Sequence, residues 1–164
     1  MELDEQQEEL FRKRQKGILP EIEFPGQIYV IDWRERVLRA KDKIEVEPIR
    51  ISERKRGFYG DNNFLIYDTR NRNVIEYKLE EPYSVANLVV LNIPGGLTLD
   101  PVGVARENGL DERKFAAIHP LTQKIVAKVV PVSRAEIRRL IGIMSAKPSE
   151  GEAIKKNSRK GKGI

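Results

Sequence analysis

Strand patterns and helix patterns occupy different parts of this chain. Residues 19–91 consist of short apolar runs separated by turn residues, which predict strands such as Ile28–Asp32. In the C-terminal half, capping residues and helical spacing predict two or three helices, and a polar N-terminal helix is predicted over residues 3–16. Strands followed by helices are typical of the α+β class. The predicted fold is therefore α+β, with a mostly antiparallel sheet of five to seven short strands.

The clearest hairpin and the most buried strand lie in the middle of the sequence. Residues 64–69 and 74–79 flank the polar segment Arg70-Asn71-Arg72-Asn73, which predicts a hairpin with Thr69 paired to Val74. Val85–Ile93 is an almost continuous apolar run that ends at a predicted Pro-Gly-Gly turn. Such a run predicts a central strand that is buried on both faces.

Capping residues mark three helix starts in the second half. Asp100 before Pro101 and Asp111 before Glu112 predict two short helices that meet at a corner. Ser133–Glu136 is a capping box, and the apolar residues after it follow at i, i+3, i+4 and i+7, which predicts an amphipathic helix. Lys124–Val130 is rich in β-branched residues and predicts one strand between these helices.

Three regions are predicted along the chain. Residues 1–17 form the polar helix, residues 18–146 a single α+β domain, and residues 147–164 a flexible basic tail. The helix offers only Leu3, Leu10 and Phe11 as an apolar stripe, so we expect it to be loosely docked.

The residue types exclude several kinds of chemistry. The chain has no cysteine and one histidine, His119, so disulfides, thiol nucleophiles and cysteine metal sites are excluded. His119 precedes a proline and is interpreted as a hydrogen-bonded loop residue. No catalytic residue, metal ligand or cofactor is predicted, and a non-enzymatic role is favoured. The acidic N-terminal segment lacks the apolar stretch of a signal peptide, and no run reaches membrane-spanning length, so a cytoplasmic protein without membrane contact is expected.

One set of residues permits an enzyme hypothesis. Asp68 on one predicted strand and Glu76 with Lys78 on the next resemble the core of metal-dependent nucleases of the PD-(D/E)xK type, in which carboxylates hold Mg²⁺. Strand alternation argues against this hypothesis. With the predicted pairing, Glu76 and Lys78 lie on one face of the hairpin and Asp68 on the other.

A second hypothesis is a helix-turn-helix at the predicted helical corner. Small, turn and core residues have roughly the required spacing, and Arg113 with Lys114 would lie on the reading helix. Against this hypothesis, Asn108 occupies a position that should be apolar. The His119-Pro120 pair would also end the second helix after two turns. A structural corner is the favoured interpretation.

Basic residues supply the strongest indication of a partner. Residues 146–164 contain six basic and two acidic residues, which accounts for most of the net charge of +5. We predict that nucleic acid binds to the basic side chains of this tail and to a basic loop with neighbouring aromatic residues. The candidate binding residues are Arg50, Arg54, Lys55, Arg56, Lys155, Lys156, Arg159, Lys160 and Lys162. For the loop, a charged segment capped by Phe58 in the core is the favoured interpretation. For the tail, a terminus that only confers solubility is an equal alternative.

Two segments of the chain resemble a known group of proteins. Leu19–Ile22, Gly26, Tyr29-Val30, Asp32 and Leu38–Asp42 form one segment, and Leu99–Arg106 forms the other. Both are similar to segments of uncharacterised proteins of anaerobic gut bacteria. The resemblance covers about a fifth of the chain; it implies a bacterial cytoplasmic setting and transfers no site.

These patterns leave three functional hypotheses. The leading one is a non-enzymatic binding module that attaches to nucleic acid or to a larger assembly through the basic residues. The first alternative is a protein–protein adaptor that docks through helix 3–16. The second alternative is the Mg²⁺-dependent nuclease that uses Asp68, Glu76 and Lys78. The patterns predict no oligomeric state.

Overall fold

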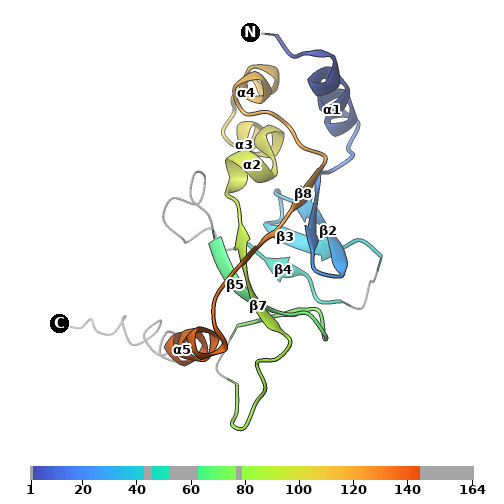
Figure 1. Ribbon diagram of the computed structural model, residues 1–164. Helices are drawn as coiled ribbons and strands as arrows, with labels where there is room; N and C mark the ends of the chain where they lie inside the picture. The colour runs from blue at the N-terminus through green and yellow to red at the C-terminus, as the bar shows by residue number, and fades with distance from the viewer. Residues whose placement is uncertain (1, 43–45, 52–62, 77–78, 145–164) are drawn as a thin grey trace, which may run out of the picture. The chain divides into compact units, whose positions relative to one another are not determined.

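The computed structural model describes residues 2–42, 46–51, 63–76 and 79–144. Within these residues the chain forms five helices and nine strands, which confirms the predicted α+β class (Figure 1). The helices are α1 (Glu5–Gln15), α2 (Gly96–Leu99), α3 (Pro101–Glu107), α4 (Glu112–Ile118) and α5 (Arg134–Met144). The strands are β1 (Glu21–Phe24), β2 (Gln27–Asp32), β3 (Val37–Ala40), β4 (Ile49–Arg50), β5 (Asn63–Asp68), β6 (Asn73–Ile75), β7 (Leu88–Ile93), β8 (Lys124–Val126) and β9 (Lys128–Val130).

The strands form two sheets rather than one. The first sheet has the order β4-β3-β2-β1-β8, and the second has the order β6-β5-β7-β9. β8 pairs in parallel with β1, whereas the other pairs of known register are antiparallel. β7 lies between β5 and β9, as predicted for a central strand.

The single strand predicted over Lys124–Val130 is wrong, because this segment forms two strands in different sheets. Ala127 separates β8 from β9, and its N–H group donates to Glu23 O of β1 at 2.9 Å. β-Branched residues lie on both sides of Ala127, so the local pattern does not indicate the change of partner, which is set by tertiary contacts.

The chain divides into two compact units, each described by itself. The first unit consists of Met1–Leu65 with Leu91–Val129, and the second consists of Ile66–Val90 with Val130–Ile164. The N-terminal helix belongs to the first unit. The single domain predicted over residues 18–146 stays a prediction.

The core of the first unit follows from strand alternation. Ile22 and Phe24 on β1 and Tyr29 and Ile31 on β2 are fully buried, while the residues between them are half-buried. Because successive side chains of a strand point to opposite faces, this alternation defines one core face of the first sheet. Trp33 follows β2 directly and is also fully buried.

Helix α1 is firmly docked within the first unit, so the prediction of loose docking is wrong. Asp4 caps it by accepting from Gln7 N at 2.8 Å. Phe11 packs with Val102, Ala116 and Leu121, and the Gln7 side chain both donates to Leu121 O at 3.1 Å and accepts from Leu121 N at 2.8 Å. Contacts between segments so distant in sequence are invisible in the helix pattern itself.

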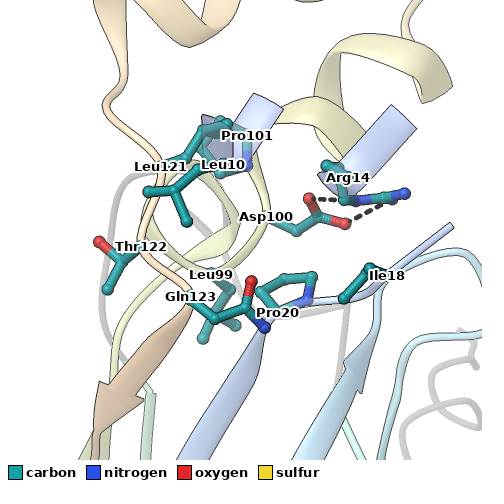
Figure 2. A pocket seen from close by; sticks show the side chains of 10 residues that line it. All are labelled: Leu10, Arg14, Ile18, Pro20, Leu99, Asp100, Pro101, Leu121, Thr122 and Gln123. Atoms are coloured by element: carbon teal, nitrogen blue, oxygen red, sulfur yellow. Dashed lines mark hydrogen bonds and ion pairs between the residues drawn. The ribbon is translucent and has the colours of Figure 1, made fainter. Parts of the chain in front are cut away.

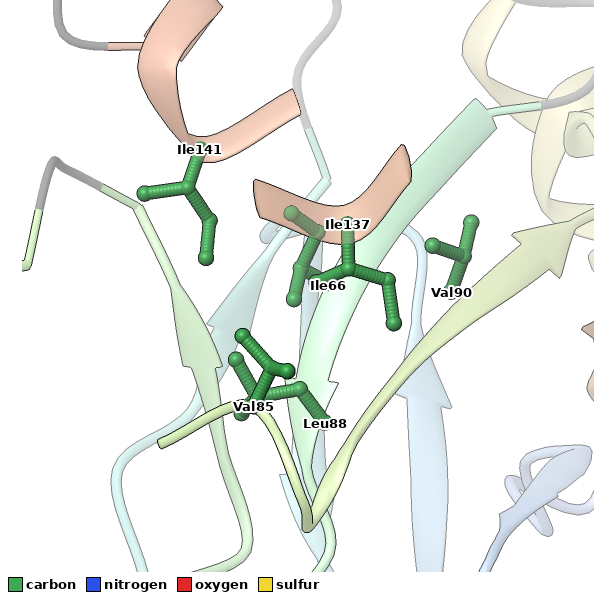
Figure 3. Packing of buried hydrophobic residues seen from close by; sticks show 6 residues of the cluster. All are labelled: Ile66, Val85, Leu88, Val90, Ile137 and Ile141. Carbon is green, nitrogen blue, oxygen red and sulfur yellow. The ribbon is translucent and has the colours of Figure 1, made fainter. Parts of the chain in front are cut away.

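The second unit is organised around α5. Its predicted cap is confirmed, since Ser133 Oγ accepts from Glu136 N at 3.1 Å. Ile137 and Ile141 on the inner side of the helix pack on Ile66, Val85, Leu88 and Val90 (Figure 3). The amphipathic spacing therefore orients α5 as predicted and leaves its other face outward.

The predicted hairpin is present, but its register is shifted by two residues. Tyr67 pairs with Val74 and Asp68 with Asn73, instead of the predicted pair Thr69–Val74. The Asp68 carboxylate accepts from the backbone N–H groups of Arg70 and Asn71 at 2.9 and 3.1 Å and so closes the turn earlier. Because side chains alternate with a period of two, a two-residue shift leaves each side chain on the predicted face of the hairpin.

The helical corner forms as predicted, with one difference at its start. Asp111 caps α4 by accepting from Lys114 N at 2.9 Å, and Gly109 after α3 has a φ of +69°, which suits glycine. The predicted turn at Pro94-Gly95-Gly96 instead leads directly into α2, whose N-cap is Gly95.

Candidate functional site

The most deeply buried charge in the described part of the chain is Asp100, between α2 and α3. Its N–H group donates to Gly96 O at 2.9 Å and closes α2, and Pro101 after it begins α3. The sequence predicts Asp100 as the side-chain cap of α3, but its carboxylate makes no capping hydrogen bond. Arg14 of α1 instead donates to both carboxylate oxygens, from Nε at 3.1 Å and from Nη2 at 2.9 Å (Figure 2).

A small hollow lies beside this ion pair. Its volume is about 20 Å³. The lining residues are Leu10, Arg14, Ile18, Pro20, Leu99, Asp100, Pro101, Leu121, Thr122 and Gln123 (Figure 2). A water molecule needs roughly 10–15 Å³ of such space, whereas ligand pockets span several hundred. The hollow therefore fits about one water molecule and is far too small for a metabolite.

Trp33 anchors the turn between β2 and β3 on α3. Its Nε1 donates to Glu107 Oε1 at 3.1 Å, and the Arg36 guanidinium lies 4.0 Å from the centre of its ring. Arg36 also forms an ion pair with Glu107. The charged groups of this cluster compensate one another, so the geometry is that of a structural junction between elements of the first unit.

The structure gives the nuclease hypothesis no geometric support. The Asp68 carboxylate is bonded to the hairpin turn, and it also accepts from Asn71 Nδ2 at 2.8 Å. The ladder places Asp68 on the same face as Ile75, so Glu76 points to the opposite face. Lys78 lies outside the described residues. In the described part of the chain, no three His, Asp or Glu side chains converge in a way that could hold a metal ion.

The helical corner formed by α3 and α4 is in contact with α1. Arg113, which the helix-turn-helix hypothesis places on the reading helix, forms an ion pair with Glu8 of α1 and lies 4.8 Å from the centre of the Phe11 ring. Lys114 is exposed. α4 has seven residues and ends at His119, whose ring lies 4.6 Å from that of Phe115. These contacts favour the structural interpretation of the corner.

Among the predicted nucleic-acid-binding residues, the structure describes only Arg50. It lies exposed on β4, opposite Val37 of β3. Arg54, Lys55 and Arg56 lie outside the described residues, and so do the tail residues Lys155, Lys156, Arg159, Lys160 and Lys162.

Helix α5 carries three exposed arginines in different environments. Arg139 donates to both carboxylate oxygens of Glu136, at 3.0 and 2.5 Å, and this contact lowers the pKa of Glu136 and raises that of Arg139. Arg138 Nη2 donates to Tyr83 O at 3.3 Å, and its guanidinium lies 4.9 Å from the centre of the Tyr83 ring. Arg134 is exposed in the first turn. No sequence signal connects Arg138 to Tyr83.

No protein-family model, curated protein or solved structure matches the chain. Within the described residues, no helix is both long and apolar enough to cross a membrane. The candidate site must therefore be judged from its own residues. In the described part of the chain, α5 carries these exposed arginines and is the element that directly precedes the basic tail in the sequence.

Proposed function

We propose that this chain is a non-enzymatic binding module that attaches to nucleic acid through its basic C-terminal part. The distribution of charge carries the proposal. Residues 130–164 contain nine basic and three acidic residues, whereas residues 1–129 contain 21 basic and 22 acidic residues. The C-terminal part therefore has a net charge of +6, which exceeds the +5 of the full chain, and the rest of the chain has a net charge of −1.

Charge pairing in the first unit supports this location. Arg14, Arg36 and Arg113 are each matched with a carboxylate of the same unit, as are Arg106 with Glu112 and Lys41 with Glu21. Paired charges attract a polyanion weakly, because the neighbouring carboxylate repels it. An unbalanced basic segment releases counterions from nucleic acid when it binds, which makes the affinity strongly dependent on salt.

The adaptor hypothesis is less favoured by the contacts of α1. Leu10 and Phe11 were its expected docking residues, and both pack within the first unit. A partner that bound through Phe11 would have to displace its contacts with Val102, Ala116 and Leu121.

The test uses the full chain and a full-length variant in which Lys155, Lys156, Arg159, Lys160 and Lys162 are changed to Gln. Binding to fluorescent single-stranded and double-stranded oligonucleotides is measured by anisotropy at several salt concentrations. We expect the full chain to bind with an affinity that falls steeply with salt, and the variant to bind much more weakly with a shallower salt dependence. Changing Lys114 to Gln on α4 gives a control for removing a basic residue elsewhere.

Two results would contradict the proposal. Absence of binding by the full chain at low salt would exclude nucleic acid as the partner. Unchanged binding by the tail variant, with binding lost when Arg50, Arg54, Lys55 and Arg56 are changed to Gln, would move the contact to that loop instead.

A further inference from the structure

The orientation of α5 is fixed by its buried side. Ile141 is fully buried and Ile137 is 4 % exposed, both within the cluster that includes Ile66 and Val90. The arginines at positions 134, 138 and 139 are all exposed. Helical spacing places Arg139 opposite Ile137, whereas Arg134 and Arg138 lie together on the flank beside the two buried residues. The helix therefore presents its positive charge from a rigid element rather than from a loop.

Helix stability does not explain the position of Arg134. Basic side chains stabilise a helix near its C-terminus, where the dipole is negative. α1 follows this rule, with Arg12, Lys13 and Arg14 in its last turn. α5 has Arg134 in its first turn and no basic residue in its last turn. The placement of Arg134 is thus slightly unfavourable for the helix itself.

The three arginines differ in their availability to an anion. Arg139 is neutralised by its bidentate contact with Glu136. Arg134 and Arg138 form no ion pair with any described carboxylate. Tyr83 restrains Arg138 through its carbonyl oxygen and its ring, and one bond from Nη2 leaves the other guanidinium N–H groups available. A guanidinium that is already restrained loses less entropy when it binds an anion.

From this arrangement we infer that the exposed flank of α5 that carries Arg134 and Arg138 is a phosphate-contacting surface for nucleic acid. Arg134 and Arg138 contact the sugar-phosphate backbone, and Tyr83 is a positioning residue for Arg138. The two arginines are one turn apart, about 6 Å along the helix axis, so they emerge on the same side. The inference rests on the proposed function and adds a folded contact surface to the basic tail that follows α5 in the sequence.

The chemistry of the surface favours phosphate backbone over base edges. The planar guanidinium matches the two oxygens of a phosphate, and contacts of this kind position a protein without reading sequence. The partner is therefore a nucleic acid bound without strong sequence preference, with an affinity set mainly by salt concentration.

The test compares full-length variants that differ in which charge they lose. Arg134→Gln and Arg138→Gln each remove one proposed contact, while Lys114→Gln removes one exposed charge on α4. The double variant Glu136→Gln with Arg139→Gln removes the neutralised pair and keeps the net charge. Affinities for a double-stranded oligonucleotide of mixed sequence are measured from 50 to 300 mM salt, roughly the range in which such slopes are resolved. Circular dichroism confirms that each variant is folded.

We expect Arg134→Gln and Arg138→Gln each to lower the slope of log affinity against log salt by about 1. Lys114→Gln and the double variant should leave the slope unchanged. Arg138→Lys keeps the charge but loses the planar fork, so its affinity should fall by about threefold. Tyr83→Leu should weaken binding without changing the net charge, because Arg138 then loses its contact with the ring and keeps only its bond to the backbone carbonyl oxygen of residue 83.

Each other outcome overturns a defined part of the inference. If the α5 variants bind like the parent while the tail variant does not, the proposed function stands and the α5 surface is wrong. If Lys114→Gln lowers the slope as much as Arg138→Gln, only net charge matters and the inference fails. If Arg138→Lys and Tyr83→Leu both bind like the parent, the positioning role of Tyr83 is wrong. If the full chain binds phosphatidylserine vesicles but no oligonucleotide, the proposed function and the inference both fail.

Discussion

Arg14 and Asp100 form a buried, bidentate ion pair across 86 residues of sequence. The Asp100 side chain is 2 % exposed and that of Arg14 is 12 % exposed, with Nη2 and Oδ2 2.9 Å apart. The pair ties α1 to the point where α2 ends and α3 begins. It is therefore one of the contacts that make the N-terminal helix part of the first unit.

Loss of Arg14 should destabilise the protein more than loss of the charge on Asp100. Arg14→Gln leaves a carboxylate buried without its cation, and breaking a buried pair in this way costs about 3 kcal/mol. Asp100→Asn keeps an acceptor oxygen, and Arg14 can still reach water at the neighbouring hollow, so the cost should be smaller. Urea unfolding of both variants measures the difference. Equal costs for the two, or a cost below about 1 kcal/mol for Arg14→Gln, would show that the pair is not effectively buried.

Replacing Phe11 should reduce stability rather than only remove a binding surface. Phe11 is 8 % exposed and packs with Val102, Ala116 and Leu121. Phe11→Ala should lower the free energy of unfolding by about 3 kcal/mol. The adaptor hypothesis instead requires a stable protein that has lost a partner. Amide hydrogen exchange should show reduced protection in α1, while Gln6→Ala on the exposed side of the same helix should change stability by less than about 0.5 kcal/mol.

Two helical glycines allow a matched test of packing around Asp100. A Cβ at Gly103 would lie 3.0 Å from Cγ of Asp100, closer still to its Oδ2, and 3.1 Å from Cβ of Trp33. Apart from its chain neighbours and the backbone of its own helix, a Cβ at Gly142 of α5 would meet no atom of the described residues within 4 Å. Alanine is favoured over glycine in helices by about 1 kcal/mol, so Gly142→Ala should stabilise the protein by up to that amount.

Gly103→Ala should have the opposite sign. Arg14 holds Asp100 in place, so relief of the contact requires backbone movement, and we expect a net loss of about 1–3 kcal/mol. Thermal unfolding of the two variants gives both values. A stabilised Gly103→Ala protein would mean that Asp100 moves aside easily and that its pairing with Arg14 is loose.

The elements that could be predicted from the sequence are those specified by nearby residues. α5 has its cap at Ser133 and its apolar spacing within eleven residues, and both are observed. The faces of the hairpin were also predictable, because a register shift of two preserves them. The register itself was not predictable. The backbone N–H groups of Arg70 and Asn71 donate to the Asp68 carboxylate, and these bonds close the turn at a different point from the one that the polar segment indicates.

Features that depend on distant contacts could not be predicted in this way. The docking of α1 depends on Gln7 bonding to Leu121 and on Arg14 finding Asp100. The division of residues 124–130 between two sheets has the same kind of cause. At the candidate site, the contact of Arg138 with Tyr83 joins residues 55 positions apart.

Acid should weaken the contact between α3 and α4 through Glu112. Arg106 donates to both Glu112 oxygens, at 2.9 and 3.0 Å, and these bonds, with a further one from Gln15, lower the pKa of Glu112. A carboxylate with a lowered pKa in the folded state binds fewer protons there than in the unfolded chain, where its pKa is about 4.3. Its contribution to stability is therefore complete above about pH 4.3 and is lost as the pH falls through the folded-state pKa.

Glu112→Gln should remove this part of the pH dependence. We expect the variant to lose less stability than the parent between pH 6 and pH 3, a range chosen to bracket about pH 4.3. Arg106→Gln should flatten the profile in the same way, because it removes the group that lowers the Glu112 pKa most. Combining the two substitutions should then flatten the profile no further than Glu112→Gln alone. Guanidinium or urea unfolding at several pH values measures these slopes. A Glu112→Gln protein with the same pH slope as the parent would mean that Arg106 does not hold Glu112 in solution.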